Sequence, residues 1–98
     1  MKYDIKQEEK TLLVAVEGEL DVRTSPEFQD ALLPALDGIT KAEIDLKDLH
    51  YISSAGLRVL LAAAKVMDNQ GEMTVKNVSE DVMDIFKITG FDELLDIE

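Results

Sequence analysis

Apolar and polar residues alternate along several short segments of the chain, and this pattern predicts strands. Residues 2–8 are mostly polar, with Tyr3 and Ile5 on alternate positions, which is typical of an edge strand with one face in water. Residues 11–16 form a nearly unbroken apolar run that is too short for a helix, so we expect a central strand that pairs with the first in a hairpin. Residues 41–46 alternate between charged and apolar side chains, which predicts a third strand with one buried face.

The segment after the second strand has the spacing of a helix. An apolar stripe runs from Phe28 to Leu36, with apolar residues three and four positions apart. The start of this helix carries two overlapping signals, a capping box that begins at Thr24 and an N-cap at Ser25 followed by proline. Gly38 is expected to stop the helix.

The helix expected over residues 54–69 is apolar nearly all round. Leu57, Leu61 and other large residues at the same spacing already fill a core face, yet the opposite side carries mainly valine and alanine, interrupted by Arg58. Such a helix is either buried on two sides or offers a docking surface, and the sequence leaves both possibilities open. We expect Gly71 to end this helix as a left-handed cap.

A fourth strand is predicted through residues 73–76, followed by a helix that begins after Ser79 and ends at Gly90. Residues 91–97 are expected to add a short strand or a fragment of helix. The order β-β-α-β-α-β-α-β predicts an α/β fold with a mixed sheet, parallel where helices cross over, and with the helices mainly on one face. The length favours one domain over residues 1–98.

Charge excludes several kinds of partner. The chain carries 21 acidic and 10 basic residues, a formal net charge of −11, so nucleic acid and anionic membrane surfaces would repel it. A basic protein surface would attract it. The chain lacks cysteine, which excludes disulfides and thiolate metal sites, and the single histidine cannot build a metal cluster. No apolar signal core or membrane-length run is present, so we expect a cytoplasmic protein.

The candidate chemistry centres on Ser53 and Ser54, which stand between a strand and a helix. A serine hydroxyl there can cap the helix by accepting an unpaired backbone N–H group. The same N–H groups and the helix dipole also suit an anion, including a phosphate carried on a serine. The residues alone leave open whether this pair is a cap or a switch.

An enzymatic interpretation would use Ser54 as a nucleophile. The Gly-x-Ser-x-Gly pattern of serine hydrolases fails because Ile52 occupies its first glycine position. His50 lies only four residues before Ser54 and is more typical of a surface loop than of a catalytic base. Acidic pairs are expected by chance in so acidic a chain. A small serine hydrolase is therefore a distant alternative.

The segment Tyr51-Ile-Ser-Ser-Ala-Gly-Leu57 follows the strand Ala42-Glu-Ile-Asp-Leu46, and Gly18-Glu-Leu-Asp21 lies some thirty residues upstream. With these motifs, essentially the whole chain resembles the anti-sigma factor antagonists of the STAS superfamily. The resemblance implies a STAS fold and places the phosphorylated serine at Ser54, with Ser53 the less favoured acceptor. Ser53 stands where the family commonly has aspartate, which is a departure from its pattern.

The resemblance also implies a function in which this chain needs no cofactor of its own. The unphosphorylated antagonist is expected to bind an anti-sigma factor that is also an ATP-dependent serine kinase, and so to release the sigma factor. Phosphorylation by that kinase ends the binding, and a metal-dependent serine phosphatase reverses it. The main alternative is a STAS module of another regulatory or transport complex that is not phosphorylated.

Further candidate site residues lie around the serine pair, and the resemblance supplies one of them. Asp21 matches the family's acid near the phosphorylated serine and is expected to orient the hydroxyl or aid phosphoryl transfer, although it can equally be a turn residue. Thr24 lines the same site or caps its helix, and Gly56 permits a close approach of the partner or of the preceding loop. The docking-face candidates are Leu57, Arg58 and Leu61, of which the two leucines can equally belong to the core.

Overall fold

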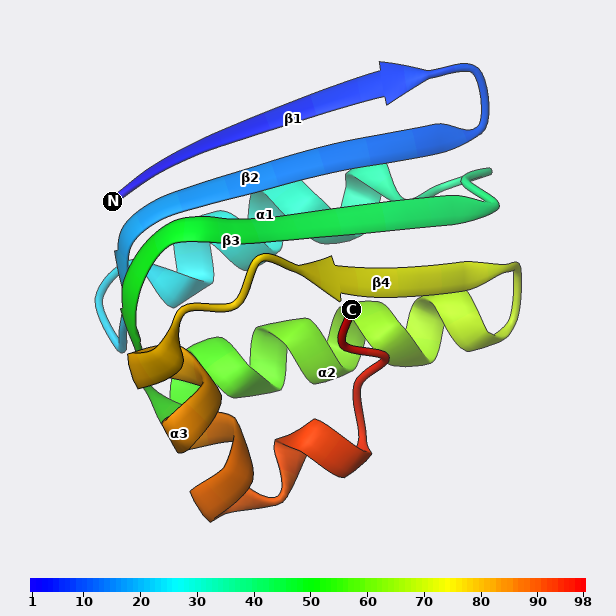
Figure 1. The fold of residues 1–98 in the computed structure, drawn as a ribbon. Helices are drawn as coiled ribbons and strands as arrows, with labels where there is room; N and C mark the ends of the chain where they lie inside the picture. Colours follow the sequence, from blue (N-terminus) through cyan, green and yellow to red (C-terminus); the bar gives the residue numbers. More distant parts are fainter.

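The structure, a computed structural model, describes residues 1–98. Its four strands span Lys2–Glu8 (β1), Thr11–Leu20 (β2), Lys41–Ile52 (β3) and Glu72–Lys76 (β4). They form one sheet in the order β1-β2-β3-β4 (Figure 1). β1 runs antiparallel to β2, whereas β2, β3 and β4 are parallel to one another.

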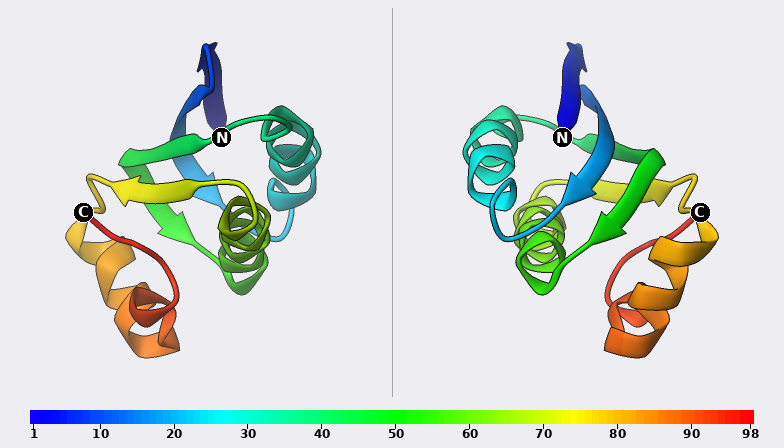
Figure 2. Two further views of the ribbon diagram at one scale, coloured as in Figure 1. Left: turned by 90° about the vertical axis from the view of Figure 1, so that its right-hand side faces the viewer. Right: turned by 90° about the vertical axis from the view of Figure 1, so that its left-hand side faces the viewer.

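The three helices are α1 (Ser25–Ala35), α2 (Ser54–Asp68) and α3 (Glu80–Thr89). α1 and α2 lie side by side on one face of the sheet, while α3 stands apart from them near the end of β3 (Figure 2). The predicted α/β fold, with a mixed sheet and helices mainly on one face, is confirmed. None of the helices has both the length and the apolar character needed to cross a membrane.

The core lies between the sheet and the helices and contains 23 buried apolar residues. On β2, Leu12, Val14 and Val16 point into this core, whereas the alternating residues Ala15 and Glu17 are exposed. This alternation gives the sheet one apolar face under α1 and α2 and one open face.

The structure decides whether the apolar helix α2 is buried on two sides or offers a docking surface. Leu60, Val59 and Ala63 are all buried, because α2 packs against β3 and β4 and also against α1. Burying both sides removes more apolar surface from water than one face could. Most of the apolar surface of α2 therefore belongs to the core.

β3 is longer than the alternation predicts. Two irregularities in its pairing with β2 each insert one extra residue into β3, so that Glu17 pairs with Asp48 and Glu19 with Tyr51. The strict alternation stops after Leu46, which predicts a connection at residues 47–50. These residues continue the strand instead, because β-bulges allow pairing to resume out of phase.

The end of the chain differs from the predicted order. Phe91–Glu93 forms a short 3-10 turn after Gly90, whose left-handed φ of 79° ends α3 as expected. The predicted last strand is reduced to a single bridge between Val75 and Ile97. The 3-10 turn and the buried Leu95 occupy most of the segment, so only its last residues lie along β4, where Val75 bonds to Asp96 and Glu98 and no longer ladder forms.

Gly71 also differs from its prediction. The residue after α2 is Asn69 in a right-handed conformation, and Gly71 has no positive φ. Gly71 instead packs directly against the backbone of Thr40. The glycine is needed for close approach rather than for a left-handed turn.

Candidate functional site

The site lies where the ends of β2 and β3 meet the start of α2. The backbone N–H of Ser53 donates a hydrogen bond of 2.9 Å to the carbonyl oxygen of Leu20. Gly56 lies against the same strand end, because a Cβ at this position would come within 2.8 Å of both the Leu20 carbonyl oxygen and the Ile52 side chain. Gly56 thus lets the first turn of α2 rest directly on the end of β2. The predicted close approach is made to the protein's own backbone.

The two serines have different roles in this geometry. Ser53 is the N-cap of α2, and its hydroxyl accepts a hydrogen bond of 3.3 Å from the N–H of Gly56. Ser54 is the first residue of the helix and is exposed. Ser53 supplies the side-chain cap, and no hydrogen bond joins the exposed hydroxyl of Ser54 to another group of the protein. The helix start therefore has a separate cap and a free hydroxyl.

Asp21 organises the turn between β2 and α1. Its Oδ1 accepts hydrogen bonds from the backbone N–H groups of Thr24 (3.1 Å) and Arg23 (2.9 Å). These N–H groups, that of Thr24 most strongly, hold the pKa of the Asp21 carboxyl below its ordinary value because they stabilise the charged form. No hydrogen bond joins Asp21 to Ser54, so the predicted action of Asp21 on the hydroxyl remains a prediction.

Thr24 belongs to the same turn and does not cap α1. Its hydroxyl accepts a hydrogen bond of 2.9 Å from the N–H of Asp21 and lies 3.0 Å from the carbonyl oxygen of Glu19. The helix begins at Ser25 without a side-chain cap from Thr24. The capping box predicted at Thr24 is therefore wrong, because the turn around Asp21 occupies its hydroxyl.

The low pKa of Asp21 predicts a pH-dependent contribution to stability. An acid whose pKa is lower in the folded than in the unfolded chain stabilises the fold above its unfolded pKa, and this stabilisation disappears as the pH falls through the folded pKa. We expect the free energy of unfolding of Asp21→Asn to lie below that of the wild type at neutral pH and to converge with it in acid. Urea titrations at a series of pH values measure the difference, and a difference that stays constant down to the lowest pH would contradict the prediction.

A shallow groove of about 320 Å³ runs between the first turns of α1 and α2. Its lining residues come from the β2–α1 turn and from both helices: Val22, Ser25, Pro26, Gln29, Asp30, Ala55, Arg58 and Val59. We call this surface the α1–α2 groove. Arg58 follows Ser54 by one helical turn, so both side chains lie on the same side of α2.

Of the three docking-face candidates, the structure leaves Arg58 and Leu61 at the surface. Arg58 is exposed and Leu61 is half-buried. Leu57 is only 2% exposed and packs in the core. Leu57 is therefore a core residue, and its assignment to the docking face is wrong, because it lies on the side of α2 that packs against the sheet.

Sequence analysis did not identify the α1 side of the groove. Val22 is 68% exposed, and it lines the groove with Pro26 and Gln29. The sequence contains one signal for this surface, because Val22 is an apolar residue in a polar turn and belongs to no apolar stripe.

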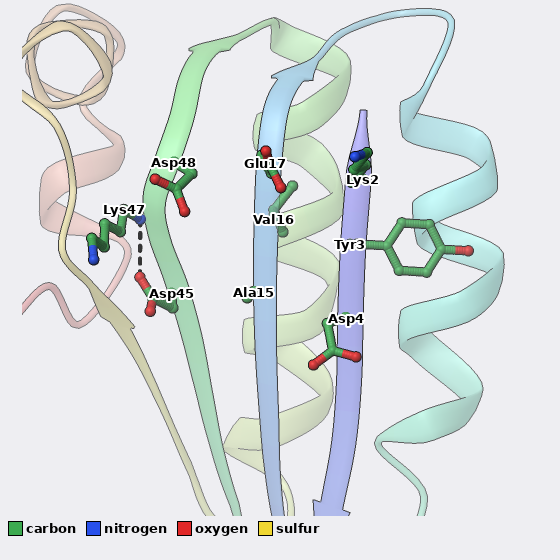
Figure 3. Close-up of a pocket in the computed structure, with 9 residues that line it drawn as sticks. All are labelled: Lys2, Tyr3, Asp4, Ala15, Val16, Glu17, Asp45, Lys47 and Asp48. Carbon is green, nitrogen blue, oxygen red and sulfur yellow. Dashed lines mark hydrogen bonds between the residues drawn. The ribbon is translucent and has the colours of Figure 1, made fainter.

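A second hollow of about 280 Å³ lies on the open face of the sheet and contains none of the predicted site residues. Figure 3 shows charged side chains of β1, β2 and β3, such as Asp4, Glu17 and Asp48, around the small Ala15, while Tyr3 points away toward α1. The chain contains no group of three or more acidic or histidine side chains that could hold a metal ion.

Comparison with known proteins identifies the fold and the family. The family model described as "Mlab, STAS domain" matches residues 3–96. The chain is 35% identical over 98 residues to the anti-sigma-B factor antagonist of Bacillus subtilis (strain 168), and the match covers 99% of this chain and 90% of that protein.

Two solved structures show the same architecture. An anti-sigma factor antagonist from Mycobacterium paratuberculosis matches with a TM-score of 0.87 and 22% identity, covering 98% of this chain and 83% of that one. The Bacillus cell fate determinant SpoIIAA in its phosphorylated form matches with a TM-score of 0.76 and 16% identity, covering 99% and 91%. Together with the family model, these likenesses show that the fold is that of STAS domains. The chain belongs to the STAS domain family, in the group of anti-sigma factor antagonists.

Proposed function

We propose that this chain is a cytoplasmic anti-sigma factor antagonist that is regulated by reversible phosphorylation of Ser54. In its unphosphorylated form it binds an anti-sigma factor with serine kinase activity and thereby releases a sigma factor. Phosphorylation by this kinase ends the binding, and a metal-dependent serine phosphatase restores it. The chain acts by binding and not by catalysis, so ATP and metal ions belong to its partners.

The observation that carries the proposal is the free hydroxyl of Ser54 at the start of α2. Ser54 is exposed, whereas the hydroxyl of its neighbour Ser53 is engaged with the N–H of Gly56. A kinase can therefore reach Ser54 without disturbing the helix cap. The names of the relatives support an anti-sigma factor as the partner. A solved phosphorylated form of a protein with this fold supports phosphorylation as the modification.

A phosphate at Ser54 is compatible with the folded chain. The first turn of a helix presents backbone N–H groups without helical partners and the positive end of the helix dipole, and both favour an anion. The nearby Arg58 adds a positive side chain one turn further along α2. The modified chain should thus stay folded, and the added charge acts on the partner's approach.

The net charge of −11 supports a basic surface on the partner. Such a surface would also approach the α1–α2 groove, whose lining contains the exposed apolar Val22 beside polar side chains. Interfaces of this kind combine a central apolar contact with a polar rim. We therefore assign partner binding to the start of α2 together with the α1–α2 groove.

Phosphorylation in vitro tests the proposal. The chain is incubated with ATP and the serine-kinase anti-sigma factor of the same organism, and the phosphorylated residue is located by mass spectrometry. We expect one phosphate on Ser54 in the wild type and none in Ser54→Ala, which should keep its fold and its binding to the partner.

The matched control is Ser53→Ala, which loses the helix cap but keeps Ser54. It should still accept phosphate, with stability reduced by about 1 kcal/mol. Phosphate on Ser53 would move the switch to the cap residue. If the chain neither accepts phosphate nor binds an anti-sigma factor, the result would favour the alternative of a STAS module in another complex.

A further inference from the structure

The free edge of β1 carries a self-complementary charge pattern. β1 pairs only with β2, and no other segment lies beyond it (Figures 1 and 2). All of its side chains are exposed except the half-buried Ile5. An edge strand of this length presents a row of unpaired backbone groups on which another strand can form hydrogen bonds.

The hairpin geometry determines which backbone groups face the free edge. A two-residue loop joins β1 to β2, and Glu8 pairs with Thr11 at its base. Two-residue hairpins close on a hydrogen-bonded pair, and such pairs alternate along an antiparallel ladder. Glu8 and every second residue before it therefore bond to β2, while the N–H and C=O groups of Tyr3, Ile5 and Gln7 point outward.

We propose that β1 is a self-association edge, on which the β1 strand of a second copy of this chain binds antiparallel with Ile5 opposite Ile5. In this register Asp4 lies opposite Lys6, Lys2 opposite Glu8, and Tyr3 opposite Gln7. Each charged side chain of β1 thus faces one of opposite sign across the two-fold axis. The outward backbone groups meet at the Ile5 pair and at the Tyr3–Gln7 pairs, so the hydrogen bonding and the charges favour the same register.

The same charges oppose the alternative registers. A shift by two residues in one direction places Lys2 opposite Lys6 and Asp4 opposite Asp4. A shift in the other direction places Asp4 opposite Glu8 and Lys6 opposite Lys6. Like charges directly opposite each other destabilise a strand pair, and a shift by one residue would reverse the two faces. Charged side chains usually protect an edge strand from any pairing, but here they select one antiparallel arrangement.

The resulting dimer would have a continuous sheet of eight strands, four from each copy. A seven-residue edge buries less than the roughly 1,200 Å² of stable interfaces, so the association should be weak and reversible. α2 contacts β3 and β4 and lies away from the β1 edge (Figure 1). Both Ser54 sites therefore stay accessible in the dimer, and this inference does not depend on the proposed function.

Sedimentation velocity with the whole chain tests the self-association edge. At concentrations from roughly 10 μM to roughly 1 mM, the wild type should shift from monomer toward dimer. Asp4→Lys or Lys6→Glu alone should lower the association constant by at least about tenfold, because two symmetry-related pairs become like-charged. The double variant Asp4→Lys/Lys6→Glu restores opposite charges and should return to within about threefold of the wild type.

Hydrogen exchange locates the contact. The amides of Tyr3, Ile5 and Gln7 should become protected as the wild-type concentration rises, while exposed amides elsewhere do not. A wild type that stays monomeric at the highest concentration overturns the inference. The inference is also overturned if the double variant associates no more strongly than the single variants. It is likewise overturned if a dimer forms while these three amides stay unprotected.

Discussion

Phosphorylation of Ser54 is expected to weaken the complex with the proposed anti-sigma factor at least a hundredfold. The phosphate adds about −1.5 to −2 charges at an exposed position that the partner must cover. Removing an unpaired dianion from water opposes association, and a loss of about 3 kcal/mol already corresponds to more than a hundredfold in the dissociation constant. Titration calorimetry of the modified and unmodified chains measures this change.

Ser54→Asp should reproduce part of this loss, because a carboxylate carries less charge than a phosphate. The matched control is Asp68→Asn at the other end of α2, where a single exposed charge is changed far from the site. The control should bind within about twofold of the wild type. Equal affinities of Ser54→Ala and Ser54→Asp would contradict the switch.

Gly71→Ala is expected to lower the free energy of unfolding by about 3 kcal/mol. A Cβ at Gly71 would overlap the carbonyl oxygen of Thr40, so the clash is with backbone and no side chain can rotate away. The same carbonyl accepts a hydrogen bond of 3.0 Å from the N–H of Glu72, at the start of β4. Relieving the overlap would separate β4 from the segment before β3.

Gly38→Ala is the matched control for this substitution. Gly38 has a φ of +75°, and no atom lies within 4 Å of the place that a Cβ would occupy, so alanine meets a conformational penalty but no clash. This variant should cost about 1 kcal/mol. Chemical denaturation of both variants measures the difference, and a Gly71→Ala no less stable than Gly38→Ala would contradict the close-packing argument.

The sequence predicted the elements wherever local patterns decide them. The alternation in residues 41–46 and the stripe from Phe28 to Leu36 depend only on which face is buried, so they could be recognised without coordinates. The serine pair could likewise be placed at a helix start. Hydroxyls before an apolar run act locally, and the cap at Ser53 formed as the spacing indicated.

Features that depend on distant segments could not be predicted in this way. The extension of β3 requires its bulged pairing with β2, and the need for glycine at position 71 comes from Thr40, thirty-one residues earlier. The roles of Leu57 and of Thr24 depend on which neighbours pack against them. Periodicity gives the direction of a side chain but not the identity of the surface it meets.

The ends of α1 and α2 remote from Ser54 are joined by the Gln70 side chain. Its Nε2 donates to the carbonyl oxygen of Ile39 at 2.7 Å and also to that of Leu36, immediately after α1. At its opposite end, α2 rests on the end of β2 through the contact of Gly56 with Leu20, so α2 is held at both ends. The surface of α1 and α2 is therefore already in its binding conformation before a partner arrives. Binding should then need little rearrangement and cost this chain little conformational entropy.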